Sequence, residues 1–284
     1  MSFIPEIEKA SHIVLIATTN ADSLCSASAF YTYLMRLQKK VTIYIDEKEL
    51  PQNLSFIPWF KTIKNNFPTS ADFIISFGVI SPTKEIMACD KVLNIDNSPE
   101  NSNYGTYNLV DLNSISISQV VFDFLQSQKV VINQKIATAL YGGLLSGSEN
   151  FLKLNGTSFA FASKMIECGA EHKKCIENIT RFCTLAGVRL KARMLLKIQL
   201  KLNGTFACFI VDENDYKESG ANESHAKDIL KEALYLPTVT HAIMIEKYKE
   251  LKIKVKHITK ENNTIKEWIE ENKDLNKIIE DIKG

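Results

Sequence analysis

The chain has 284 residues, of which 45% are hydrophobic and 24% are charged, and its formal net charge is +1 at pH 7. This length accommodates two domains of ordinary size. The near-zero net charge excludes a global attraction to nucleic acid or anionic lipid, although a local basic groove is compatible with it. The sequence has no CxxC pair, no apolar run of about 20 residues and no signal-peptide pattern at its start. We therefore expect a cytoplasmic protein with reduced thiols and no membrane partner.

Residues 1–150 alternate between short apolar runs and helical patterns. Strands are predicted at 12–17, 41–45, 73–77 and 92–95, and helices at 22–39, 116–126 and 133–146. The strand segments are rich in Ile and Val and apolar on both faces, as expected for a parallel sheet covered by helices. The alternation predicts an N-terminal α/β domain that is doubly wound around a mainly parallel sheet.

The pattern changes after residue 150. Helices predicted at 158–167, 171–184 and 188–200 form a helical connector over residues 151–200. A strand at 205–211, a helix at 223–236 and a hairpin of 241–246 with 251–258 then indicate a smaller C-terminal α+β domain over residues 201–284.

The tail of the chain carries a further helical pattern. Thr264 and Glu267 have the spacing of a capping box. One face of the predicted C-terminal helix then carries Ile265, Trp268, Ile269, Leu275, Ile278, Ile279 and Ile282. This helix is expected either to dock on its own domain or to bind a partner or a second copy.

Polar residues follow several of the predicted strands and helices in the first domain. Candidates for a ligand-binding role are Asn20, Ser23, Ser28, Asn97, Ser98, Ser146 and Ser148, and the candidate metal ligands are Asp22 and Asp96. Ser and Asn at these places are also common helix caps, which is the structural alternative for each. No residue is assigned a catalytic role.

The segment from Thr18 to Ser28 resembles a motif of the DHH phosphoesterases, the superfamily of RecJ-like exonucleases and of the nanoRNase/pAp phosphatases. In that family the first strand ends in His-x-x-Pro-Asp-Gly-Asp. Thr18 takes the position of the His, Asp22 keeps the first Asp, and Leu24 takes the position of the second Asp. Leu24 is thus expected to place an apolar side chain where the family has a metal-facing carboxylate.

The resemblance covers nearly the whole chain, as several weak motifs in register. The Asp-His-His signature corresponds to Asp96-Asn97-Ser98, so the acid remains and both His are replaced. A further family motif, Tyr-Thr-Gly-Ile-x-Thr-Asp-Thr-Gly-x-Phe, falls on residues 141–151 with Gly147 at the Asp. The second domain resembles a degenerate DHHA1 domain, because the family's Gly-Gly-Gly-His loop does not follow Thr259.

The resemblance implies hydrolysis with two divalent cations, usually manganese, that activate a water and clamp the phosphate oxygens. Several anionic or imidazole ligands must offset the repulsion between two such cations, and Asp22 and Asp96 alone cannot do so. We therefore expect a catalytically impaired protein with no bound metal, and Mn²⁺ or Mg²⁺ only if residual activity survives. It would serve as a binding or scaffold module for a protein partner, for self-association, or for a nucleotide or short RNA held between the two domains.

The alternative is an active metal-dependent phosphodiesterase or phosphatase on pAp, cyclic dinucleotides or short oligoribonucleotides. In that case Asp90, Asp111 or Glu149 would complete the metal site beside the two remaining acids.

Two stretches of the chain are locally basic. Lys252, Lys254 and Lys256 alternate along one predicted strand and therefore share one face of its sheet. A second stretch comprises Arg181, Arg189, Lys191, Arg193 and Lys197. Each is either a solvated outer face or a weak phosphate-binding surface whose affinity would fall steeply with salt.

Overall fold

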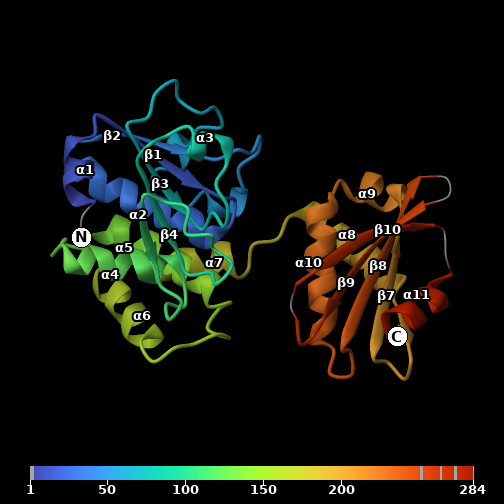
Figure 1. The fold of residues 1–284 in the computed structure, drawn as a ribbon. Helices are drawn as coiled ribbons and strands as arrows, with labels where there is room; N and C mark the ends of the chain where they lie inside the picture. Colours follow the sequence, from blue (N-terminus) through green and yellow to red (C-terminus); the bar gives the residue numbers. More distant parts are fainter. Residues whose placement is uncertain (1–2, 250–251, 263, 272–273, 284) are drawn as a thin grey trace. The chain divides into compact units, whose positions relative to one another are not determined.

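The computed structural model describes residues 3–249, 252–262, 264–271 and 274–283. The chain forms two compact units, Met1–Phe182 and Cys183–Gly284, which are described separately (Figure 1). The predicted α/β class with a smaller second domain is confirmed. The segment predicted as a connector, 151–200, is divided between the two units. Among the described residues, no helix is long and apolar enough to cross a membrane.

The first unit is built on a five-stranded parallel sheet in the order β2-β1-β3-β4-β5. The strands are β1 (His12–Ala17), β2 (Lys40–Tyr44), β3 (Phe73–Phe77), β4 (Val92–Asp96) and β5 (Tyr107–Val110). The four predicted strands are present, whereas β5, a half-exposed edge strand, was not predicted. In this strand order the direction of winding reverses between β1 and β3, the point at which such sheets bind ligands beyond their carboxyl ends.

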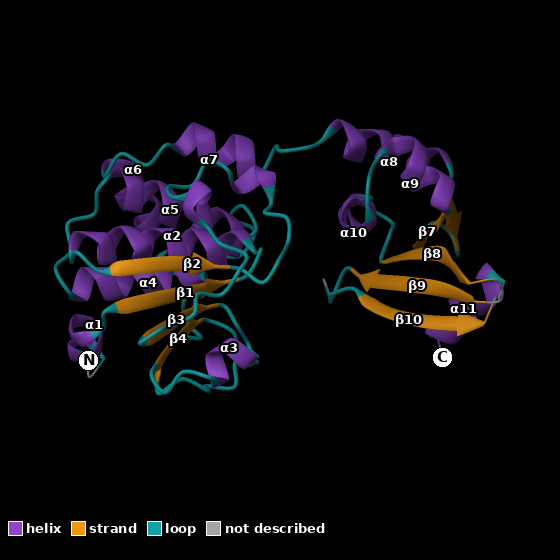
Figure 2. Cartoon of the chain, turned by 90° about the horizontal axis from the view of Figure 1, so that it is seen from above, coloured by secondary structure: helices purple, strands orange, loops and turns teal. Residues whose placement is uncertain are grey.

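Helices cover both faces of this sheet (Figure 2). They are α1 (Ile4–Lys9), α2 (Ala21–Arg36), α3 (Lys84–Met87), α4 (Ile117–Ser127), α5 (Gln134–Gly147), α6 (Ser158–Glu167) and α7 (His172–Ile179). Because side chains alternate along a strand, Ile13 and Leu15 of β1 join the larger core with α2, α4 and α5. Val14 and Ile16 point to the other face, toward α3.

The second unit has a mixed sheet in the order β10-β9-β8-β7-β6. Its strands are β6 (Gln199–Lys201), β7 (Phe206–Val211), β8 (His241–Lys249), β9 (Lys252–Thr259) and β10 (Lys266–Glu271), and its helices are α8 (Leu185–Leu196), α9 (Glu213–Ser219), α10 (Glu223–Glu232) and α11 (Leu275–Lys283). Only β7 and β8 are parallel among these described pairs. Helices α8 and α10 pack on one face, and α11 packs on the other.

The single helix predicted for the tail is wrong. Residues Lys266–Glu271 form the edge strand β10, in which Trp268 pairs with Val255 of β9. Leu275, Ile278 and Ile279 do share a helix face, but they lie on the short helix α11 and are buried against their own sheet. Residues 272 and 273, which the predicted helix spanned, lie outside the described residues.

Candidate functional site

A cavity of about 320 Å³ lies beyond the carboxyl ends of β1, β3 and β4, where the strand order reverses. We call it the strand-end cavity. Seven of the nine predicted site residues line it: Asn20, Asp22, Ser23, Asp96, Asn97, Ser98 and Ser146. The wall also contains Ile80, Ile115 and Ile117, so the cavity is partly apolar.

Asp22 lies in the first turn of α2 and caps the start of α4. Its Oδ2 accepts a hydrogen bond from the backbone N–H of Ile117 at 2.7 Å. Its Oδ1 accepts two more, from the backbone N–H of Ser118 at 3.0 Å and from the Ser118 hydroxyl at 2.7 Å. Burial raises the pKa of Asp22 to about 6, although the hydrogen bonds from Ser118 and Ile117 act in the opposite direction. Both oxygens therefore already have protein partners.

Two glycines of α5 make this arrangement possible. A Cβ at Gly147 would lie 2.5 Å from the Ser116 Cβ and 2.9 Å from Asp22 Oδ2, and a Cβ at Gly143 would overlap the Ser118 hydroxyl. The two glycines are four residues apart and share one face of the helix. The absence of side chains on that face lets Asp22 and the start of α4 approach the α5 backbone. Gly147 is the position at which the family motif has its Asp.

Asp96 is the last residue of β4, and both oxygens of its carboxylate likewise accept hydrogen bonds. Its Oδ1 accepts hydrogen bonds from the backbone N–H groups of Asn97 at 2.7 Å and Ser98 at 3.2 Å. Its Oδ2 accepts one from the Asn101 side-chain amide at 2.6 Å. Asn101 is in turn bonded to Asn94, a fully buried amide within β4. Neither amide was predicted to belong to the site, although an Asn inside the apolar run Val92–Ile95 indicates a buried polar network.

Most of the remaining neutral residues at the cavity cap a helix or form a hydrogen bond with nearby backbone. Asn20 caps α2 by accepting from the backbone N–H of Asp22 at 2.8 Å. The Ser23 hydroxyl donates to the Phe77 carbonyl at 2.7 Å, and the Asn97 side chain donates to the Ser114 carbonyl at 3.0 Å. Ser98 accepts from the backbone N–H of Glu100. These contacts match the alternative role as helix caps and loop contacts, and not a ligand-binding role.

Three residues singled out from the sequence, and Phe77 at the end of β3, do not reach the cavity. Ser28 is buried within α2 and donates to the Pro58 carbonyl at 2.5 Å, and Ser148 accepts from the backbone N–H of Phe151 at 3.0 Å. Leu24 and Phe77 are fully buried in the core of the first unit. The expectation that Leu24 faces the metal position is therefore wrong, since its side chain points away from the cavity.

The donor set at the cavity does not fit a pair of divalent cations. Asp22 and Asp96 each already accept three hydrogen bonds, so each carboxylate has about one of its four lone-pair sites left for a metal. Of the acids considered as replacements, Glu149 alone lines the cavity, and it forms an ion pair with Lys153 at 2.7 Å. Asp111 instead accepts from the Ser114 hydroxyl. Within the described part of the chain, no three His, Cys, Asp or Glu side chains converge on a common metal position.

In the second unit, neither alternative predicted for the β9 lysines, a solvated face or a phosphate-binding surface, holds for Lys254 and Lys256. Lys256 is fully buried, with its Nζ in contact with Glu246 of β8 and 3.2 Å from Glu223 of α10. Lys254 Nζ lies 2.6 Å from Glu267 and 3.1 Å from Glu223. Because α10 covers this face, these lysines are neutralised by carboxylates and are not available to phosphate.

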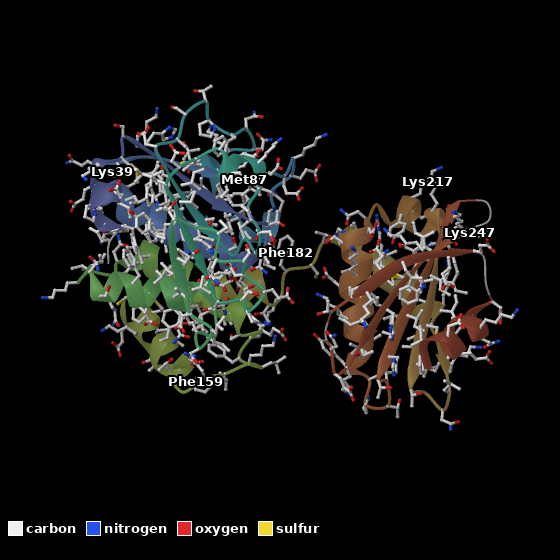
Figure 3. The ribbon with its side chains drawn as sticks, in the orientation of Figure 1. Lys39, Met87, Phe159, Phe182, Lys217 and Lys247 are labelled. Carbon is white, nitrogen blue, oxygen red and sulfur yellow. The ribbon has the colours of Figure 1, made fainter. Side chains whose placement is uncertain are left out.

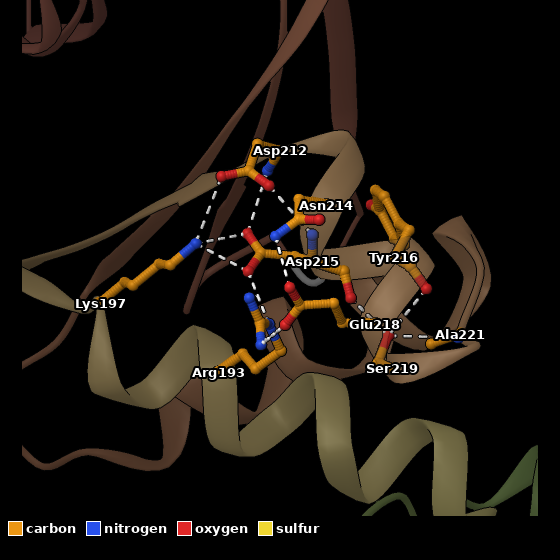
Figure 4. A network of polar contacts seen from close by, with 9 residues as sticks. All are labelled: Arg193, Lys197, Asp212, Asn214, Asp215, Tyr216, Glu218, Ser219 and Ala221. Atoms are coloured by element: carbon orange, nitrogen blue, oxygen red, sulfur yellow. Dashed lines mark hydrogen bonds and ion pairs between the residues drawn. The ribbon is translucent and has the colours of Figure 1, made fainter.

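The second basic stretch is also largely paired (Figure 4). From α8, Arg193 Nε lies 2.9 Å from Asp215 Oδ1, and Lys197 Nζ lies 2.7 Å from the same carboxylate. Burial alone would raise the pKa of Asp215, but the hydrogen bonds from Lys197, from the Asp212 backbone and from Arg193 lower it. Lys191 pairs with Glu232. Arg181 and Arg189 are exposed and lie in different units.

The chain has the fold of the DHH/DHHA1 phosphoesterase superfamily, with a parallel sheet in the first unit and a smaller mixed sheet in the second. Acids lie at the strand ends of the first unit. A Streptococcus mutans protein described as a bifunctional oligoribonuclease and PAP phosphatase, NrnA, is 23% identical over 158 residues, which are 55% of this chain and 50% of that protein. The match thus spans half the length of that relative. No family model matches the chain.

Solved structures agree with this fold. An exopolyphosphatase-related protein from Bacteroides fragilis superposes with a TM-score of 0.84 and 14% identity, over 99% of this chain and 93% of that one. A Methanococcus jannaschii protein assigned to the family II inorganic pyrophosphatases gives a TM-score of 0.50 and 12% identity, over 89% of this chain and 93% of that one. At such identities the likeness shows the fold alone. The superfamily predicted from the strand-end motifs is confirmed at that level.

Proposed function

We propose that this protein has a phosphoesterase fold without efficient phosphoesterase activity and that it acts by binding. The observation that carries the proposal is the engagement of Asp22 and Asp96, whose carboxylate oxygens accept hydrogen bonds from Ile117, Ser118, Asn97, Ser98 and Asn101. Carboxylates that hold catalytic cations must direct their oxygens toward the metals. Here most of the acceptor sites of both carboxylates are used to stabilise α4 and the loop after β4, which leaves too few for two cations.

A small ligand and a macromolecular partner are both part of this proposal. The strand-end cavity, at about 320 Å³, is within the size range of small-molecule sites. Its lining of hydroxyl and amide groups supports a nucleotide or the end of a short RNA as ligand. Met87 and Phe159 are 69% and 64% exposed at separate places on the first unit (Figure 3). Apolar side chains exposed singly in this way are common, so the protein partner or self-association is proposed from the missing metal ligands alone.

The test is hydrolysis of pAp and of an RNA dinucleotide with millimolar Mn²⁺, beside a superfamily member that has all its ligands. We expect no turnover above background, and Asp22→Ala and Asp96→Ala should leave this background unchanged. Turnover within about tenfold of the control enzyme, equivalent to about 1.4 kcal/mol in the activation barrier, would contradict the proposal. So would a large loss of turnover in either variant.

A further inference from the structure

A second cavity, of about 420 Å³, lies at the other end of the packed helices α2 and α5. The strand-end cavity is lined by the first turn of α2 and the last turn of α5, whereas this one is lined by Arg36 at the end of α2 and Lys135 at the start of α5. We call it the Trp59 cavity. The rest of its wall consists of Thr32, Met35, Trp59, Asn133 and Gln134. At 1.5 Å per residue, Asp22 and Arg36 are about 20 Å apart along α2. The two cavities are therefore separate sites.

The two cavities differ in charge. The described lining of the strand-end cavity contains the carboxylates Asp22, Asp96 and Glu149 and no cationic side chain. The described lining of the Trp59 cavity contains the cations Arg36 and Lys135 and no carboxylate. Coulomb attraction therefore favours the phosphate of a nucleotide in the Trp59 cavity, whereas the strand-end cavity is better suited to the uncharged sugar and base.

Trp59 provides a fixed aromatic wall. Its indole Nε1–H donates to the Thr32 hydroxyl at 2.9 Å, and its ring packs against Tyr31 with 5.2 Å between the centroids. The Lys135 Nζ lies 4.4 Å from the centroid of the Trp59 ring, within the range of a cation–π interaction. The ring is therefore held in place by α2, and the Lys135 side chain that lies over it is itself exposed to solvent.

Arg36 and Lys135 retain donors for a ligand. Arg36 Nη1 donates to the Val131 carbonyl at 2.6 Å, which uses one of the five N–H groups of the guanidinium. Neither Arg36 nor Lys135 forms an ion pair with any described carboxylate. A guanidinium and an ammonium beside an aromatic ring suit a ligand that combines a phosphate with a planar base.

We propose that the Trp59 cavity binds a nucleoside phosphate, with the base on the Trp59 ring and the phosphate between Arg36 and Lys135. On binding, the Lys135 side chain moves from the ring face to the phosphate. The ligand is either a free mononucleotide or one nucleotide of a single-stranded RNA, since both present the same chemistry. The inference goes beyond the proposed function and holds whether or not the strand-end cavity hydrolyses phosphoesters.

The experiment titrates the full-length protein with AMP in EDTA at low salt, which removes any metal-dependent contribution of the strand-end cavity. Trp59 and Trp268 are the two tryptophans of the chain, so the Trp268→Phe variant makes Trp59 the sole indole reporter. We expect AMP to quench Trp59 fluorescence. Arg36→Gln in this background should weaken AMP binding at least tenfold, and Lys48→Gln, at an exposed lysine outside the cavity, should change it less than twofold.

Further ligands distinguish a free nucleotide from single-stranded RNA and show whether the base and the phosphate are both needed. Adenosine and inorganic phosphate should each bind at least tenfold more weakly than AMP. An oligoadenylate of four nucleotides that binds tenfold more tightly than AMP would identify single-stranded RNA as the source, and equal affinity would identify the free nucleotide. The proposal is overturned if AMP causes no quenching, if Arg36→Gln binds as well as the parent, or if inorganic phosphate binds as tightly as AMP. Circular dichroism of each variant verifies that it is folded.

Discussion

Asp22 and Ile117 are 95 positions apart in the sequence, and the Asp22 carboxylate accepts the backbone N–H of Ile117 at 2.7 Å. Ile117 is the first residue of α4, so a side chain from α2 satisfies a donor that the helix itself leaves unpaired. The favourable interaction between a carboxylate and a helix N-terminus adds to this contact. An acid that the resemblance aligns with a metal ligand thus has a clear structural role.

This role predicts that Asp22 contributes to stability. In Asp22→Asn, an amide N–H₂ would face the N–H of Ile117 or Ser118, and two donors cannot bond each other. We expect the free energy of unfolding, from urea denaturation followed by circular dichroism, to fall by about 1–3 kcal/mol. Glu149→Gln is the control, because Glu149 lines the same cavity but forms only a solvent-exposed ion pair, and its effect should stay below about 1 kcal/mol. An Asp22→Asn protein as stable as the parent would contradict the capping role.

The pKa of Asp22 predicts a specific dependence of stability on pH. Burial raises this pKa from 3.8 to about 6, so between these values the folded chain binds more protons than the unfolded chain. The contribution of Asp22 to the free energy of unfolding therefore falls as pH rises from about 4 to 6, by up to about 3 kcal/mol. The stability difference between the parent and Asp22→Ala should accordingly be larger at pH 4 than at pH 7. A difference that is flat or grows with pH would show that the raised pKa is not correct.

The packing at Gly147 predicts that any side chain there is costly. Its Cβ would lie 2.5 Å from the Ser116 Cβ, so Gly147→Ala forces α4 and α5 apart. We expect a loss of about 1–3 kcal/mol in the free energy of unfolding, and a larger loss for Gly147→Asp. Gly156→Ala is the matched control, since no atom lies within 4 Å of a Cβ at that position. Its effect should stay within about 1 kcal/mol, and equal effects at the two glycines would argue against the close approach of the helices.

The buried cation of the second unit gives an independent prediction. Lys256→Met leaves the largely buried Glu246 carboxylate without its lysine partner, which is expected to cost about 3–5 kcal/mol in thermal or urea denaturation. Lys252→Met, at an exposed lysine of the same strand, should have little effect. Adding Glu246→Gln to Lys256→Met should restore part of the loss. If Lys252→Met and Lys256→Met are equally mild, the pairing in the second unit is not important for stability.

The sequence predicted most of the fold because the central strands are unambiguous. β1, β3 and β4 are buried at every position, and such short apolar runs have few alternatives to a covered parallel sheet. The edge strands β5 and β10 are partly exposed and have mixed composition, so their pattern competes with that of loops and helices. In the tail, Ile265, Trp268 and Ile269 fit a helical spacing, which obscured the pairing of Trp268 and Ile269 with the preceding strand β9.

The candidate site shows a similar limit. Its location followed from the motifs around Asp22 and Asp96, which do line one cavity. The partners of these acids did not follow, because α4 is reached only through the fold and Asn101 lies in a loop with no periodic pattern. Likewise, Lys254 and Lys256 alternate as an exposed face would, and only the position of α10 shows that the face is covered.

The two glycines on α5 also bear on whether residue 147 could carry a metal ligand. A carboxylate at residue 147 would have to enter space now held by Ser116 and Asp22, so it could be accommodated only after α4 had shifted. Moving α4 would in turn remove the partners of Asp22 before any cation could replace them. A carboxylate introduced at residue 147 therefore lowers stability before it can bind a cation. If the proposed loss of activity is correct, the packing of α4 against α5 opposes its reversal by single substitutions.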